Sequence, residues 1–152
     1  MHKPFPHAGF LDQLIHHTTS PSGTTEAATW PAALSMLCDA QGSPTPAAKH
    51  LVELLQAKQA VLRAASDTEQ VANSLRRYQK FAKPGQPSPQ IVQLRQQQAA
   101  ARQATSQARQ SFIAAAAAFV REAGIEVPPR VALMAFIDRW IEIHVPADAP
   151  TP

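Results

Sequence analysis

The sequence predicts an all-α protein: a helical bundle built on a long antiparallel αα-hairpin, with shorter N- and C-terminal helices packed at its open end. The composition favours helices over sheets, because alanine and glutamine are abundant, glycine occurs only 5 times and charged residues make up 16%. The 14 prolines gather near the termini and between periodic segments, where they delimit helices. Two long stretches repeat apolar residues every three or four positions, as one face of a helix requires. At 152 residues the chain has the length of one domain.

Residues 1–24 are expected to form a mostly flexible N-terminal tail, since they contain three prolines and lead into the polar stretch TTSPSGTT. The tail has one apolar patch, which consists of Phe10, Leu11, Leu14 and Ile15. This patch predicts at most two helical turns that dock on the helical domain. A single helical domain is expected over residues 25–145. Residues 146–152, PADAPTP, are expected to be a disordered C-terminal tail.

The first helix of the domain is expected to begin after Thr29, a suitable N-cap, and to stop before Gly42. Pro31 fits its first turn. Its apolar side is predicted to consist of Trp30, Leu34, Leu37 and Cys38. In the following connector, GSPTP, Thr45 can cap the next helix and Pro46 can take the first helical position.

Residues 46–82 are predicted to form the first long helix of the hairpin. Apolar residues at alternating spacings of three and four continue for four heptads, which is the seam of a coiled coil. The seam consists of Leu54, Ala57, Val61, Ala64, Thr68, Val71, Leu75, Tyr78 and Ala82. Ser66 and Glu69 have the spacing of a capping box, which would start a new helix. We favour one continuous helix, because the seam passes through this stretch in phase.

Residues 89–123 are predicted to form the second long helix, with Ser88 as N-cap and Gly124 as C-terminal stop. Alanine in the middle of its seam lets two helices approach closely. The seam consists of Leu94, Gln97 or Gln98, Ala101, Ala104, Ala108, Phe112, Ala115 and Phe119. Because the connection KPGQPSP is short, the two long helices should be antiparallel neighbours.

Residues 128–145, PPRVALMAFIDRWIEIHV, are apolar on almost every side. Such a segment must be buried, either at the open end of the hairpin or against a second copy of the chain. The residues assigned to the core or to self-association are Met134, Phe136, Ile137, Trp140 and Ile141. Alternation within WIEIHV leaves a short strand over residues 141–145 as an alternative to a helix.

Positive charge is concentrated in the hairpin. Residues 63–109 contain eight cations and two acids, a net charge of +6, whereas residues 1–62 carry −1 and residues 110–152 carry −2. These eight cations are called the basic arm below, and they are the predicted partner-binding residues: Arg63, Arg76, Arg77, Lys80, Lys83, Arg95, Arg102 and Arg109. In the predicted register Arg95 opposes Arg77 and Arg109 opposes Arg63, an arrangement of like charges that destabilises a helix pair. The arm therefore favours binding to something acidic.

An uncompensated basic surface attracts acidic protein surfaces, nucleic-acid phosphates or anionic lipid heads. Tyr78 and Phe81 are too few aromatic residues for a base-stacking platform. A nucleic-acid complex would therefore rest on phosphate contacts without strong sequence specificity. A solvated basic face that only keeps an alanine-rich hairpin soluble is a further interpretation. The sequence leaves homo-oligomer formation open.

No catalytic, cofactor-binding or metal-binding motif stands out in the sequence. Cys38 is the single cysteine, so no intrachain disulfide can form, and nothing in the sequence places its thiol beside a histidine. No two histidines have the spacing of a zinc site. Asp138 and Glu142 share a helix face and are expected to be solvated or paired with a nearby arginine.

The expected function is a non-enzymatic binding or adaptor protein whose basic arm engages an acidic partner, protein or nucleic acid, without a cofactor. The alternatives are a nucleic-acid-binding accessory protein and a small enzyme with an unrecognised site. The longest apolar run, residues 112–120, is shorter than the roughly 20 residues that cross a bilayer. A cytoplasmic protein is therefore expected, although export by a dedicated secretion machine would leave no signal of this kind.

Overall fold

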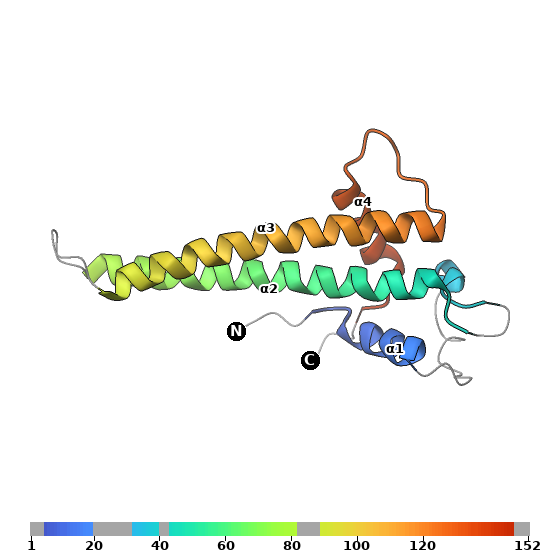
Figure 1. The fold of residues 1–152 in the computed structure, drawn as a ribbon, viewed down its shortest axis with the longest axis horizontal. Helices are drawn as coiled ribbons and strands as arrows, with labels where there is room; N and C mark the ends of the chain where they lie inside the picture. The colour runs from blue at the N-terminus through green and yellow to red at the C-terminus, as the bar shows by residue number, and fades with distance from the viewer. Residues whose placement is uncertain (1–4, 20–31, 40–42, 82–88, 148–152) are drawn as a thin grey trace.

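Two long helices, α2 (Pro46–Phe81) and α3 (Pro89–Ala123), lie side by side and form the antiparallel hairpin expected from the sequence (Figure 1). The computed structural model describes most of the chain, namely residues 5–19, 32–39, 43–81 and 89–147. α3 has its predicted bounds, and α2 has its predicted start. Ala82, the predicted last residue of the first long helix, and Ser88, the predicted N-cap of the second, lie outside the described residues.

α2 is one continuous helix, so the alternative of a new helix at Ser66–Glu69 is wrong. The apolar seam explains the continuity, because the side chains that face α3 keep their phase through this stretch. Thr68 lies on the seam, and its hydroxyl donates to the carbonyl oxygen of Ala64 at 2.8 Å, within the same helix.

The register of the hairpin is set near its middle by two threonines. The hydroxyl oxygens of Thr68 and Thr105 lie 3.2 Å apart, and that of Thr105 also lies 2.9 Å from the carbonyl oxygen of Ala101. The observed register therefore agrees with the predicted one to within a residue. The seam of α3 passes through half-buried Thr105, and Ala104, which the sequence placed in the seam, is exposed. Either residue fits spacings of three and four, so the periodicity did not distinguish them.

α3 ends as predicted at Gly124, which has a φ of 69°. The N–H of Ile125 donates to the carbonyl oxygen of Val120 at 3.0 Å. This is the long hydrogen bond of a Schellman motif, which requires the left-handed backbone that glycine adopts most easily. Val120 and Ile125 both pack against the core, so the cap also fixes the direction of the chain that leaves α3.

The core lies at the open end of the hairpin, where α1 (Ala8–Thr19), the 3₁₀ helix η2 (Ala32–Leu37) and α4 (Leu133–His144) pack against it (Figure 1). The shorter helices thus occupy the end that the sequence predicted. α4 continues to His144, so the alternative of a strand over residues 141–145 is wrong. Helical spacing explains this, because it buries Ile137, Trp140 and Ile141 together.

The first helix of the domain differs from its prediction. The structure has only the six-residue η2, followed by a bridge between Cys38 and Pro44, and Thr29–Pro31 lie outside the described residues. The turn after η2 replaces further helix, because the N–H of Asp39 donates to the carbonyl oxygen of Ser43 at 2.9 Å. The hydroxyl of Thr45 donates to the carbonyl oxygen of Met36 at 2.6 Å, so it holds this turn.

α1 has 12 residues, three turns rather than the predicted two at most. Its apolar patch docks as expected, with Phe10, Leu11 and Leu14 buried. The N- and C-terminal segments meet beside it, since His7 Nδ1 lies 3.1 Å from the carbonyl oxygen of Pro146. The elements that pack on the open end of the hairpin, α1, η2 and α4, are called the body below, and they come from both ends of the chain.

Candidate functional site

The basic arm holds eight of the 14 lysines and arginines of the chain. Its seven described cations are all exposed, while Lys83 lies outside the described residues. Among the described residues, Lys58 forms an ion pair with Asp138, and His50 lies 3.7 Å from Glu53, a contact between charges only when the histidine is protonated; neither contact includes a cation of the arm. Arg76 makes hydrogen bonds only within its own helix, the shorter being 2.7 Å to Asn73. The charge of the arm is thus not neutralised within the described structure.

Arg95, Arg102 and Arg109 form one stripe along α3, because residues seven apart lie on the same side of a helix in a coiled coil. The next position of this repeat is Ala116, which is fully buried at the open end. The stripe therefore runs along the side of the hairpin that the body covers at the open end. Beyond the body the three arginines are exposed.

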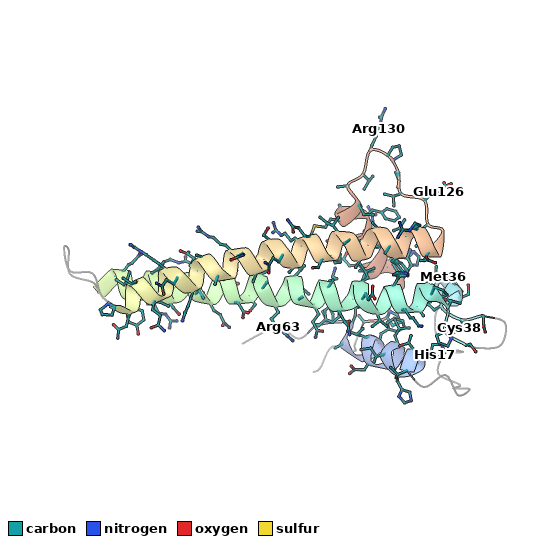
Figure 2. All side chains as sticks on the ribbon, in the orientation of Figure 1. His17, Met36, Cys38, Arg63, Glu126 and Arg130 are labelled. Atoms are coloured by element: carbon teal, nitrogen blue, oxygen red, sulfur yellow. The ribbon has the colours of Figure 1, made fainter. Side chains whose placement is uncertain are left out.

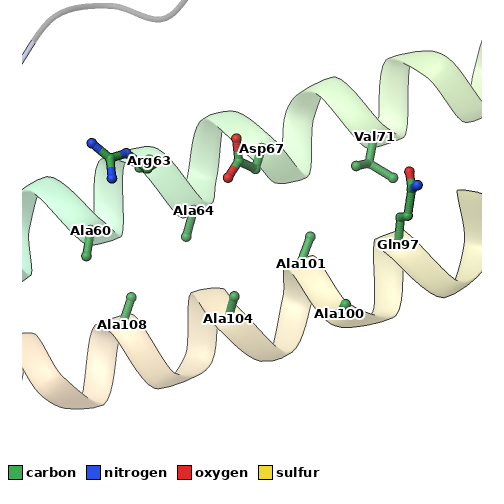
Figure 3. A pocket seen from close by; sticks show the side chains of 10 residues that line it. All are labelled: Ala60, Arg63, Ala64, Asp67, Val71, Gln97, Ala100, Ala101, Ala104 and Ala108. Atoms are coloured by element: carbon green, nitrogen blue, oxygen red, sulfur yellow. The ribbon is translucent and has the colours of Figure 1, made fainter.

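The hairpin carries an open groove on another side, with a volume of about 520 Å³ (Figure 3). Alanines from both helices form most of its lining, because their side chains are too short to fill the space between α2 and α3. Three polar residues, Arg63, Asp67 and Gln97, also line it. The remaining lining residues are Ala60, Ala64, Val71, Ala100, Ala101, Ala104 and Ala108.

The positions of Arg63 and Arg109 correct one sequence expectation. The register does bring them to the same level of the hairpin, but Arg63 borders the groove (Figures 2 and 3). Arg109 belongs to the stripe that ends at buried Ala116. The two arginines therefore point to different sides of the hairpin, and the repulsion inferred from the sequence is weaker than direct opposition would give.

The body leaves the groove side of the hairpin uncovered along its whole length. Near the open end of α2, Leu51, Leu54 and Leu55 are buried, whereas Glu53 and Gln56 are exposed. On α3, Phe112 and Ala116 are likewise buried on the covered side, whereas Ser111 and Ala114 are exposed. The side of the hairpin that holds the groove is called the groove face below. It is defined on α2 by Glu53, Ala60, Arg63, Asp67 and Arg77, and on α3 by Gln97, Ala104 and Ser111.

The structure brings together one pair that the sequence did not connect: Cys38 Sγ lies 3.3 Å from His17 Nε2 (Figure 2). α1 positions His17, which is 3% exposed, and the turn after η2 positions Cys38. Burial raises the pKa of the Cys38 thiol, and the negative charge of Asp39 raises it further. Because a nucleophilic cysteine needs a lowered pKa, this pair has the geometry of a nucleophile and base but not the electrostatics.

Cys38 is accordingly expected to react slowly with thiol reagents. Alkylation of the native protein by iodoacetamide should become half-maximal at a higher pH than alkylation of the same protein unfolded in urea, because the thiolate is the reacting species. Mass spectrometry at a series of pH values measures both profiles. A native midpoint below the unfolded one would contradict this assignment and would favour a reactive cysteine.

Asp138 does not pair with the arginines near it in the sequence. Its carboxylate accepts a hydrogen bond of 2.8 Å from the ammonium group of Lys58, a side chain that is 14% exposed. This ion pair joins α4 to α2 at the edge of the body. Glu142 is exposed, so the two carboxylates have different surroundings.

The C-terminal apolar cluster lies mainly inside the body. Ile137, Trp140 and Ile141 belong to the core, and Met134 and Phe136 are half-buried against it. The ring of Trp140 meets that of Phe119 edge to face, with centroids 5.2 Å apart. These contacts occupy the buried side of α4, while Ile143 remains 64% exposed.

Within the described parts of the chain, no three histidine, cysteine, aspartate or glutamate residues are grouped so that they could hold a metal ion. None of the described helices is both long and apolar enough to cross a membrane. In comparisons with protein-family models, curated proteins and solved structures, nothing matched this chain. The site must therefore be interpreted from its own geometry.

The arm cations are visible in the sequence, whereas the groove and the placement of the groove-face charges are not. In the sequence, Asp67 and Glu53 are visible only as acids that reduce the net charge. A signal was available, since Ala60 and Asp67 repeat at seven residues beside the seam. This repeat can be interpreted only when it is known which side of the hairpin the body covers.

Proposed function

We propose that this protein is a non-enzymatic binding protein whose basic arm engages an acidic helix of a partner protein. The observation that supports the proposal is the arginine stripe: Arg95, Arg102 and Arg109 are exposed, aligned and without an ion pair among the described residues. They span about 21 Å on a rigid helix, at 1.5 Å of rise per residue. Such a row costs little conformational entropy to organise when a partner binds.

The heptad spacing favours a helical partner over nucleic acid. A partner helix packed along α3 repeats at the same interval, about 10.5 Å for seven residues, so carboxylates at heptad spacing can meet all three arginines. Phosphates of a nucleic-acid backbone share no such repeat with the stripe. The alanine and glutamine background adds no aromatic ring for base stacking.

The test is binding of a fluorescent helical peptide with glutamate at heptad spacing, measured by anisotropy at several salt concentrations. The triple variant Arg95→Gln, Arg102→Gln and Arg109→Gln should bind the peptide about tenfold more weakly or worse at low salt, because three charge contacts are lost. The affinity of the unmodified protein should fall as salt rises, since the contacts are solvent-exposed.

The matched control removes three exposed arginines elsewhere: Arg121→Gln, Arg130→Gln and Arg139→Gln. Its net charge equals that of the arm variant, and its affinity should stay within about twofold of the unmodified protein. Equal losses in the two triple variants would contradict the proposal, because binding would then depend on net charge alone. Tighter binding of duplex DNA or single-stranded RNA, lost selectively in the arm variant, would favour a nucleic-acid partner instead.

A further inference from the structure

We propose that the groove face binds a second copy of this chain, so that two hairpins stack in antiparallel orientation as a four-helix bundle with α2 against α2 and α3 against α3. This surface lies on a different side of the hairpin from the arginine stripe. The proposal shares Arg63 and Arg77 of the basic arm with the function proposed above, but it does not involve Arg95, Arg102 or Arg109, so the two can be tested separately.

The groove face has the shape of an incomplete bundle. Its lining is mainly alanine, and the alanines Ala60, Ala100 and Ala104 are exposed to solvent. Small residues allow another helix pair to approach closely and to cover this apolar surface. α1, η2 and α4 leave the face uncovered, so nothing within the described chain has to move aside.

Four charges of the groove face on α2 are symmetric about Ala65, while Lys49, at the heptad position of Arg63 and Arg77, has no charged counterpart. Arg63 and Asp67 each lie two residues from it, and Glu53 and Arg77 each lie twelve residues from it. A two-fold axis at the level of Ala65 runs α2 antiparallel to its copy. It places Arg63 opposite Asp67 of the second copy, and Glu53 opposite Arg77 of the second copy. Symmetry repeats each contact, which gives four ion pairs of opposite charge.

These side chains are available for such contacts. All four are exposed, and Arg63, Asp67 and Arg77 take part in no ion pair among the described residues. Glu53 lies 3.7 Å from His50 Nδ1, a distance too long for a hydrogen bond. An isologous interface requires a patch complementary to itself, and the alternation of acid and base along this stripe meets that requirement.

The part of the same face of α3 that lies next to the seam is uncharged, as a closely packed core between two copies requires, and the outer edge carries one charge near the open end, Arg121, seven residues after exposed Ala114. Residues at heptad spacing on it are small or carry an amide: Gln97, Ala104, Ser111 and Ala118. The parallel alternative would stack residues 63–109 of the two copies, a segment of net charge +6, on one another. The antiparallel arrangement instead separates these two segments, because each then lies over the open end of the other copy, mostly outside its residues 63–109.

A two-fold axis at the level of Ala65 also gives nearly complete overlap of the two hairpins. Ala65 lies within two residues of the middle of the 36-residue helix α2. A face about 50 Å long and about 18 Å wide, two helices side by side, offers on the order of 900 Å² per copy. A stable interface of standard size needs about 800 Å² per copy, so this face is large enough for a dimer.

Sedimentation velocity over a dilution series tests the proposal. The unmodified protein should sediment as a dimer that dissociates on dilution, and Asp67→Arg should raise the dissociation constant about tenfold or more. Each reversal replaces two ion pairs by two like-charge contacts with Arg63. Glu69→Arg is the matched control, because Glu69 is also exposed on α2 but lies outside the groove face. The dissociation constant of this variant should match that of the unmodified protein apart from the effect of net charge, which both variants share.

The decisive variant is the charge swap Arg63→Asp with Asp67→Arg, which restores opposite charges between the copies. It should dimerise more tightly than either single variant, and circular dichroism should show equal helix content in all of them. A monomer at every concentration, or a dimer that Asp67→Arg weakens no more than Glu69→Arg does, would overturn the proposal. So would a swap that associates no better than its single variants.

Discussion

Replacing Phe119 with alanine is expected to lower the free energy of unfolding by about 3–5 kcal/mol, the usual cost of removing a buried aromatic side chain. Phe119 is fully buried and joins α3 to α4 through its edge-to-face contact with Trp140. Its loss leaves a cavity between these helices, which can close only in part because α3 is held against α2 in the hairpin. Denaturation in urea, followed by circular dichroism, measures the difference.

Ile113→Ala provides the matched control on the same helix. Because Ile113 is 44% exposed, folding removes much less of its apolar surface from water. Its cost should stay below about 1 kcal/mol. A natural domain is stable by only about 5–15 kcal/mol, so Phe119→Ala should remove a large part of the total. Similar stabilities for the two variants would show that the contact between α3 and α4 contributes little, contrary to the burial of Phe119.

The hairpin was predictable from the sequence because its signal is local and repeated. Four heptads of spacing fix the direction of one helix face, and prolines and Gly124 fix the ends. The N-terminal half of the body was harder, since η2 ends at a turn closed by the bridge between Cys38 and Pro44. Hydrogen bonds between residues several positions apart decide that turn, and no periodicity precedes it.

The candidate sites also have a part that was predictable from the sequence and a part that was not. The arm cations were visible as a count, but the side to which each one points depends on the register and on where the body docks. The contact of Cys38 with His17 depends on the docking of α1, and that of Lys58 with Asp138 joins residues 80 positions apart. Such contacts follow from packing, which a single sequence does not specify.

Ala116→Arg tests the assignment of the arginine stripe to the side of the hairpin that the body covers. Position 116 continues the repeat of Arg95, Arg102 and Arg109, and alanine and arginine have similar helix propensities. Because Ala116 is fully buried, an arginine there would crowd a packed core and bury an unpaired charge. The expected cost exceeds about 4 kcal/mol, enough to separate the body from the hairpin. Thermal unfolding and near-ultraviolet circular dichroism measure it.

Ala117→Arg distinguishes burial from every other effect of the substitution. Ala117 is the next residue of the same alanine run and is exposed, so the new charge and the new side chain are identical while the environment differs. Its stability should stay within about 0.5 kcal/mol of the unmodified protein. If Ala116→Arg were as stable as Ala117→Arg, the body would not cover this stripe, and Arg95, Arg102 and Arg109 would no longer be assigned to the side of the hairpin opposite the groove face. The two proposed binding surfaces would then have to share one side, and a dimer would compete with the acidic partner.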